Sequence, residues 1–263
     1  MQPEQAGDKP CAGFSSKRTG VGASGLAARL AGVKLEIVLS KPIPPWILAG
    51  GFVLTCAAGS INAVGFLGMH HQAISHMSGT VTVLSNELAT GQFSLAWYAV
   101  MVVLAFFTGS VLSAVIIRQS ALKLGRRYGV ALMLESVLLI VASRLLAHGD
   151  YMGECLAAMA CGLQNAMATH YSGAIIRTTH VTGIITDLGI AVGLKFTGEP
   201  IEKRRTGLLL VLLAGFFTGG ILGSWGYTLL GFDTLLFPAA LTGVAGGGYF
   251  AYKYFARRGM AES

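Results

Sequence analysis

Hydroxyl and glycine residues recur at matched places in two parts of the chain, where they could bind a small solute. Ser78 is followed by Gly79, and Thr182 is followed by Gly183. Ser and Thr are typical first residues of helices, whose unpaired N–H groups and positive dipole end favour an anionic or hydrogen-bond-accepting guest. We therefore predict that two short helices begin at Ser78 and Thr182 and that their starts bind a solute. The alternative is that both hydroxyls only cap their helices.

Three amides extend this candidate site. Asn62, Gln164 and Asn165 lie within long apolar runs. An amide that faces lipid is costly, so we expect all three to turn toward the interior of a helical bundle. There they either line a solute pathway or join helices by hydrogen bonds, and the sequence favours neither.

Three acids lie in or near apolar segments. Asp187 falls inside the second short helix, and a buried carboxylate there is a candidate group for coupling to protons or cations. Glu87 lies near the end of the first short helix, and we expect it at the surface. Glu135 lies well inside an apolar run, where Arg144 is nine residues away on the same helix and the sequence shows no partner on another helix.

Other chemistry has little support. His76 and His180 precede the short helices and could titrate near neutral pH, but no local Cys, His or carboxylate at ligand spacing accompanies them as a metal site requires. The four cysteines form no CxxC pair and are expected to be inert. The chain has no HExxH, no GxSxG and no phosphate-binding loop. We therefore expect no metal, no cofactor and no enzymatic activity.

Composition indicates a membrane protein. Of the 263 residues, 53% are hydrophobic and 12% are charged, whereas soluble domains carry roughly 25% charged residues. The 36 glycines fit helices packed in lipid. The net charge of +7 comes from basic residues at the ends of apolar runs, a pattern typical of topology signals and not of nucleic-acid binding. We predict an all-α polytopic helical bundle whose main partner is the lipid bilayer.

Six apolar runs are long enough to cross a bilayer, which takes roughly 20 helical residues. Two shorter segments, residues 78–89 and 182–196, are better explained as re-entrant half-helices. With these segments re-entrant, the basic loops at 118–127 and 203–205 lie on the same side as both basic termini. The prediction is six spanning helices, two half-helices and cytoplasmic N- and C-termini. The six runs are 46–67, 93–117, 128–147, 155–176, 206–230 and 234–255.

The chain divides into three parts. Residues 1–45 are rich in Gly, Ala and Ser and end in a proline cluster, so we predict a disordered basic cytoplasmic tail. Residues 46–256 form the membrane domain, and residues 257–263 form the cytoplasmic C-terminus.

The membrane domain contains an internal repeat. FFTGS at 106–110 recurs as FFTGG at 216–220, and upstream matches place Asn62, His76 and Ser78 opposite Asn165, His180 and Thr182. The halves, about 46–147 and 153–256, hold three spanning segments each. Because three is odd, the second half enters from the opposite side and the repeats are inverted, an arrangement that places a site between the halves. A duplicated bundle without a transport role is the alternative.

Small residues follow a regular spacing in both copies. Ala105, Gly109 and Ser113 match Gly215, Gly219 and Gly223, each set spaced by four residues on one helix face. Such stripes let helix backbones approach closely in lipid. We assign them a packing role and no contact with solute.

Three strings in these segments are similar to a known family. They are GLQNA at 162–166, HVTGIITDLG at 180–189 and HMSGT at 76–80. Through them the chain resembles, over about residues 46–255, the YoaK family of bacterial multi-pass membrane proteins, designated DUF1275, whose function is unknown. The resemblance implies a location in the bacterial inner (cell) membrane but no substrate. The family pattern has Asp-Ala where this chain has Asn62-Ala63, which argues against a proton role at residue 62.

The sequence thus predicts a transporter or channel for a small polar or anionic solute. A non-transporting membrane scaffold or accessory subunit is the competing hypothesis, but it does not explain polar residues at matched points of both repeats. The solute and the oligomeric state stay open, including a homo-oligomer. The predicted solute-binding residues are Asn62, Ser78, Gly79, Gln164, Asn165, Thr182 and Gly183, with Asp187 as the coupling group.

Overall fold

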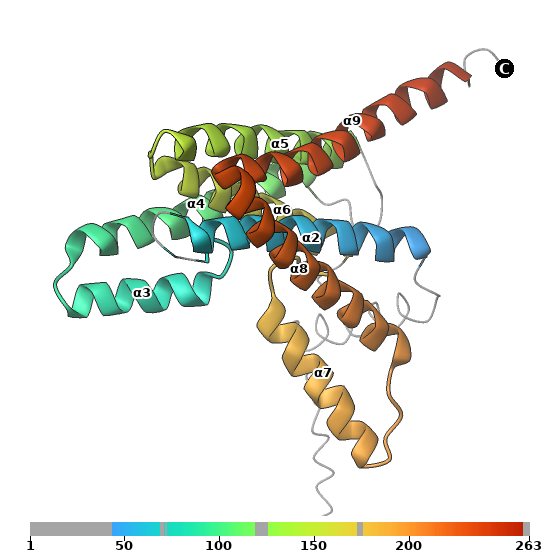
Figure 1. Ribbon diagram of the computed structural model, residues 1–263. Coiled ribbons are helices and arrows are strands. Elements are labelled where there is room, and N and C mark those ends of the chain that lie inside the picture. Colours follow the sequence, from blue (N-terminus) through green and yellow to red (C-terminus); the bar gives the residue numbers. More distant parts are fainter. Residues whose placement is uncertain (1–43, 69–70, 72, 119–125, 173–175, 260–263) are drawn as a thin grey trace, which may run out of the picture. The chain divides into compact units, whose positions relative to one another are not determined.

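All regular structure in the described part of the chain is helical, as the sequence predicts. The computed structural model describes residues 44–68, 71, 73–118, 126–172 and 176–259, within the compact unit Pro42–Ser263. The tail predicted for residues 1–45 lies almost entirely outside the described residues. Figure 1 shows the helices in chain order. They are α2 (Pro45–Leu67), α3 (Met77–Ala89), α4 (Phe93–Ile117), α5 (Arg126–Ala147), α6 (Met152–Ser172), α7 (Val181–Phe196), α8 (Lys203–Leu230), the 3-10 helix η1 (Gly231–Leu235) and α9 (Leu236–Gly259).

Each predicted apolar run coincides closely with one of these helices. Among the described residues, four segments are long and apolar enough to cross a membrane, judged by length and composition. α6 is also long, but it carries Glu154, Gln164 and Asn165, and such polar side chains lower its hydropathy. These four segments support the prediction of a membrane protein, but they do not confirm the predicted count of six spans. The four are Pro45–Leu67, Phe93–Ile117, Arg127–Ala147 and the continuous stretch Lys203–Gly248.

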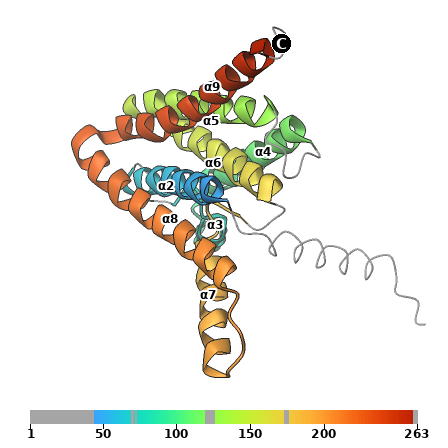
Figure 2. The ribbon, with the colours of Figure 1, turned by 90° about the vertical axis from the view of Figure 1, so that its right-hand side faces the viewer.

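Two long helix pairs form the centre of the unit. α2 packs most extensively against α8, and α4 packs against α6, while α5 packs against both α6 and α9. The views in Figures 1 and 2 show α5 and α9 running side by side. In the predicted repeat, α2 corresponds to α6 and α4 corresponds to α8. The first long helix of each half therefore packs against the second long helix of the other half.

Glycine lets the paired backbones touch in both interfaces. A Cβ on Gly109 of α4 would overlap the carbonyl oxygen of Met159 on α6, and a Cβ on Gly219 of α8 would overlap that of Cys56 on α2. Gly109 and Gly219 occupy the same place in the two FFTG strings, and Cys56 and Met159 share the offset of the upstream repeat. The same contact thus occurs once in each pair. The packing role predicted for these glycines is confirmed.

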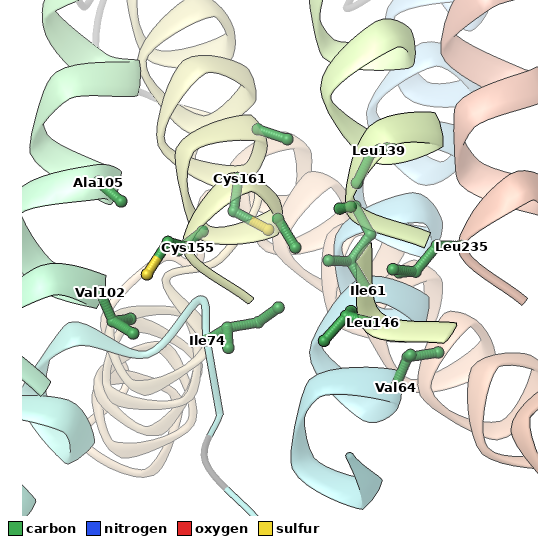
Figure 3. Close-up of a cluster of buried hydrophobic side chains, with 14 of the residues drawn as sticks. Ile61, Val64, Ile74, Val102, Ala105, Leu139, Leu146, Cys155, Cys161 and Leu235 are labelled. Atoms are coloured by element: carbon green, nitrogen blue, oxygen red, sulfur yellow. The ribbon is translucent and has the colours of Figure 1, made fainter. Parts of the chain in front are cut away.

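Small and branched side chains fill the space between the pairs. Figure 3 shows Cys155, Cys161 and Ala105 gathered where α4 meets α6, with Ile61 and Leu139 on the facing elements, and all five are buried. The described cysteines are free thiols. In a bilayer, lipid tails are as apolar as leucine, so close packing stabilises such a core more than the exclusion of water does.

The two short helices lie against the helices that follow them. α3 packs against α4 and α7 packs against α8, and each pair forms a hairpin in Figure 1. Each short helix buries one residue, Thr80 in α3 and Ile184 in α7, and these share the repeat offset of His76 and His180. Much of the remaining surface of both helices is exposed, which suits contact with lipid or with a second chain.

The N-caps of the short helices differ from the prediction. We expected Ser78 and Thr182, but the N-cap positions are His76 and His180, and neither side chain makes a capping hydrogen bond. The N–H of Thr80 already bonds to the carbonyl oxygen of His76 at 3.2 Å, which closes the first turn of α3. Ser78 and Thr182 are therefore second residues of their helices, and their hydroxyls are not the caps.

Candidate functional site

A carboxyl and an amide meet inside the bundle where α5 packs on α6. Gln164 Nε2 donates a hydrogen bond to Glu135 Oε1 at 2.9 Å, and both side chains are fully buried. The sequence showed Glu135 no partner on another helix, and Arg144 instead pairs with Asp233 at 3.4 Å. The structure thus brings a predicted solute-site amide to an intramembrane acid.

Two oxygen atoms of this pair have no hydrogen-bond donor among the described residues. They are Glu135 Oε2 and Gln164 Oε1, and both are buried. A buried polar group left unsatisfied costs about 1–3 kcal/mol, and more when it is charged. Such a group is unusual in an apolar core, because most buried polar atoms have a partner and packing alone would favour a hydrophobic side chain. The pair is therefore a place where a proton or a donor group can bind.

Asn62 holds the chain that leads from α2 to α3. Its Oδ1 accepts hydrogen bonds from Ser75 Oγ at 2.8 Å and from the Ser75 N–H at 3.3 Å. Beside it, Ile74 packs on Gly65, where a Cβ would come within 2.7 Å of the Ile74 side chain. Asn62 lies five residues before the end of α2, which is roughly 8 Å at 1.5 Å of rise per residue. The chain after α2 therefore folds back along the helix by about that distance. Chain return of this kind is what a re-entrant segment requires.

A groove of about 640 Å³ lies between α2 and α8 next to Asn62. Ser224 and Thr228 of α8 are the other residues with polar side chains along it, and the remaining lining is apolar or glycine. The His76 ring packs edge-on against Phe216 of the same groove, with 5.6 Å between ring centroids. The groove combines a few polar groups with an apolar wall, as sites for small molecules do.

Asn165 occupies the position in α6 that Asn62 occupies in α2. It is half-buried, and its Oδ1 is buried with no donor among the described residues. Consecutive helical residues point about 100° apart, so Asn165 and Gln164 face different sides of α6. Both halves therefore present an amide at the same place, but only Asn62 has its acceptor occupied by a described residue.

The predicted residues at the starts of the short helices are mostly exposed. Ser78, Gly79 and Thr182 are exposed, and Gly183 lies under the His180 ring, which a Cβ at residue 183 would overlap. Among the described residues, no hydrogen bond joins their side chains to the amides. The structure thus brings together Gln164 with Glu135 and Asn62 with Ser75, and leaves the helix starts open to the surroundings.

Asp187 is less buried than the sequence suggests. Its Oδ2 lies 2.8 Å from the guanidinium nitrogen of Arg205, and the two side chains are 37% and 46% exposed. The α7–α8 hairpin causes this pairing, because it lays the second short helix along the basic start of α8. The carboxylate is therefore compensated by a neighbouring charge.

Sequence reasoning missed a second polar contact in the core. The hydroxyl of Tyr98 on α4 donates to Glu154 on α6, and both residues are buried. The predicted run begins at residue 155, but α6 begins at Met152 and Glu154 lies in its first turn. An acid in the first turn suits the positive end of the helix dipole. Only that short-range signal was available, since Tyr98 is 56 residues away.

A family model matches most of the chain. It is described as a protein of unknown function (DUF1275) and matches residues 50–247, which run from α2 into α9. No curated protein matches the chain, and no solved structure does. The matched region contains every polar contact described above.

Proposed function

Because the chain belongs to the DUF1275 family, whose function is unknown, we propose a function from the arrangement of its own residues. The protein is a transporter or channel for a small polar or anionic solute and not an enzyme. It resides in the bacterial inner membrane, with α2, α4, α5, α6, α8 and α9 as spans, α3 and α7 as re-entrant helices, and both termini in the cytoplasm. The alternative is a non-transporting membrane scaffold.

One observation carries this proposal, the pair of amides at equivalent places before the two short helices. Asn62 binds the returning chain through Ser75 and lines the groove between α2 and α8. Asn165 keeps a buried oxygen without a donor among the described residues. Polar side chains at membrane depth are costly and typically mark a solute or ion pathway. Sites of inverted-repeat transporters lie between the halves, next to helices that start within the membrane.

The pairing of the long helices supports inverted repeats. α2 with α8 and α4 with α6 are reciprocal pairs, and the contact of Gly109 with Met159 recurs as that of Gly219 with Cys56. A two-fold relation between the halves produces reciprocal contacts of this kind. Three crossings in each half then make that axis lie in the membrane plane.

A scaffold accounts for less of the molecule. It explains the glycine contacts and the buried thiols, since both serve packing. It gives no reason for the free oxygen of Asn165 or for the Glu135–Gln164 pair, because hydrophobic residues of similar volume would pack the same space at lower cost.

Solute flux in proteoliposomes tests the proposal. The full-length protein is assayed with panels of small carboxylates, inorganic anions, amino acids and polyols. Asn165→Leu and Thr182→Val are expected to lower flux at least tenfold, and Asp187→Asn tests the predicted coupling group. Thr108→Val is the matched control, because that exposed hydroxyl donates to the carbonyl oxygen of Leu104 on its own helix. Parent-level flux in all three site variants would refute the site assignment, and no flux with any solute would favour the scaffold.

Cysteine labelling tests the orientation separately. The described cysteines are buried, so in a Cys11→Ser, Leu122→Cys protein the label reports on the introduced thiol. A membrane-impermeant maleimide should label it only from the cytoplasmic side. Labelling from the periplasm would overturn the topology.

A further inference from the structure

We propose that the Glu135 carboxyl, held by the Gln164 amide, is a proton-binding site at the centre of the bundle. Glu135 lies near the middle of α5, and Gln164 lies past the middle of α6. Both side chains are fully buried. The inference rests on the proposed transport function, for which it names proton coupling. It places that role on Glu135, whereas the sequence placed it on Asp187.

No described basic side chain compensates a charge on Glu135. Of the elements packed against α5, α6 presents the Cys161 thiol and the Gln164 amide toward it. The titratable side chain of α4 is Tyr98, which bonds to Glu154, and that of η1 is Asp233, which bonds to Ser143 and Arg144. The described side chains of α9, through Gly248, include none that titrate.

A bare carboxylate is therefore unstable in this environment. Moving an ionised carboxylate into an apolar medium without a partner costs so much that the group becomes neutral instead. Uptake of one proton from water converts the carboxylate to a carboxylic acid and breaks no bond between heavy atoms. Release returns the proton to water and leaves the charged form, which persists only when the surroundings rearrange or a solute compensates it. Proton binding and release at Glu135 therefore depend on the conformation of the bundle, as coupling of a proton to solute transport requires.

The geometry favours a proton over a metal cation. Gln164 directs its N–H donor at Glu135 Oε1, so the amide would repel a cation at that oxygen. Cation sites in transporters use carbonyl groups of unwound helices, whereas α5 and α6 run unbroken through these residues. No three His, Cys, Asp or Glu side chains of the described residues converge as metal ligands.

An apolar cavity lies about one helical turn from the pair. It measures about 220 Å³ and is lined by Leu132 of α5, Met167 and Ala168 of α6 and the first turns of α2, including Trp46. The loose packing gives α5 and α6 room to move relative to α2, and Glu135 itself is fully buried in the present conformation. Proton exchange therefore needs a second conformation, in keeping with alternating access.

Infrared difference spectroscopy tests the proton site without any solute. The full-length protein in proteoliposomes is titrated with acid and base, and the carbonyl stretch of a protonated carboxylic acid is followed in H₂O and D₂O. The parent should show a band that shifts in D₂O and responds to pH. Above the pH at which exposed carboxyls, with pKa values of about 4, are ionised, Glu135→Gln should remove the part of the band that comes from Glu135, whereas Glu199→Gln, at an exposed loop acid, should leave the band unchanged. Gln164→Leu should move the band to a new frequency, because it removes the hydrogen bond to Oε1.

The outcomes separate this inference from the transport proposal. Glu135→Gln should melt at or above the parent temperature, because an amide is isosteric with the neutral acid. A parent band whose intensity is unchanged in Glu135→Gln, or the absence of a band from a folded parent at every pH, overturns the proton site even where solute flux is found. A band lost only in Glu135→Gln supports the proton site even where no solute moves. Where a solute is found, a pH gradient should accelerate its flux in the parent and not in Glu135→Gln.

Discussion

Gly109 and Met159 touch through their backbones where α4 crosses α6. The carbonyl oxygen of Met159 occupies the space that a Cβ at residue 109 would need. Close approach of this kind increases van der Waals contact between helices, which is a main source of stability in lipid. A single methyl group at this point must therefore push the two helices apart.

We predict that Gly109→Ala lowers the free energy of unfolding by about 1–3 kcal/mol, the usual effect of overpacking. Thermal unfolding of the full-length protein in detergent measures the change. Gly220→Ala is the matched control, since nothing lies within 4 Å of a Cβ there, and it should leave stability unchanged or raise it through helix propensity. Equal losses in both variants would contradict the contact.

Tyr98→Phe should lower the free energy of unfolding by about 1–3 kcal/mol, because it removes the hydroxyl that donates to buried Glu154. Tyr151→Phe is the control: the Tyr151 ring packs edge-on against Tyr98, but its side chain is exposed. Chemical denaturation of the same detergent-solubilised protein compares the two. A larger loss in Tyr151→Phe than in Tyr98→Phe would argue against a structural role for the hydrogen bond.

The Asp187–Arg205 ion pair should contribute little to stability. Both side chains are partly exposed, and pairs of this kind contribute about 0–1 kcal/mol and weaken in salt. A double-mutant cycle with Asp187→Asn and Arg205→Gln, measured at low and high salt, gives the coupling energy. A value of several kcal/mol that is insensitive to salt would show that the pair is buried in the assembled protein.

Filling the apolar cavity next to α6 should stabilise the bundle. Ala168 lines the cavity of about 220 Å³, so Ala168→Leu adds apolar contacts in open space and should raise the free energy of unfolding by about 1 kcal/mol. Ala160→Leu, on the same helix but in the packed core, should instead lower it by about 1–3 kcal/mol. If the two variants changed stability in the same direction, the cavity would not exist in the folded protein.

The same pair of alanines also probes conformational change. If movement of α5 and α6 relative to α2 admits protons to Glu135, Ala168→Leu should slow the pH response of the infrared band at least tenfold while leaving its final amplitude unchanged. An unchanged rate would place proton entry elsewhere.

Most of the secondary structure could be predicted from the local composition of the sequence. The apolar runs predicted the ends of α2 and α4 to within one residue. They could do so because the length of a membrane span depends on consecutive residues and not on distant partners. The FFTG strings marked Gly109 and Gly219 as packing positions, because small residues at every fourth position form one helix face. The membrane class followed from the low share of charged residues.

The tertiary structure alone decided which polar groups meet. Glu135 finds Gln164 across 29 residues, and Glu154 finds Tyr98 across 56 residues. Each contact depends on where two helices cross and how each is rotated about its axis, and no local pattern encodes that. For the same reason the sequence placed the coupling acid at Asp187: a residue's position along a helix was visible, but its surroundings were not. Glu135 is fully buried, unlike Asp187, because α5 turns that face toward α6.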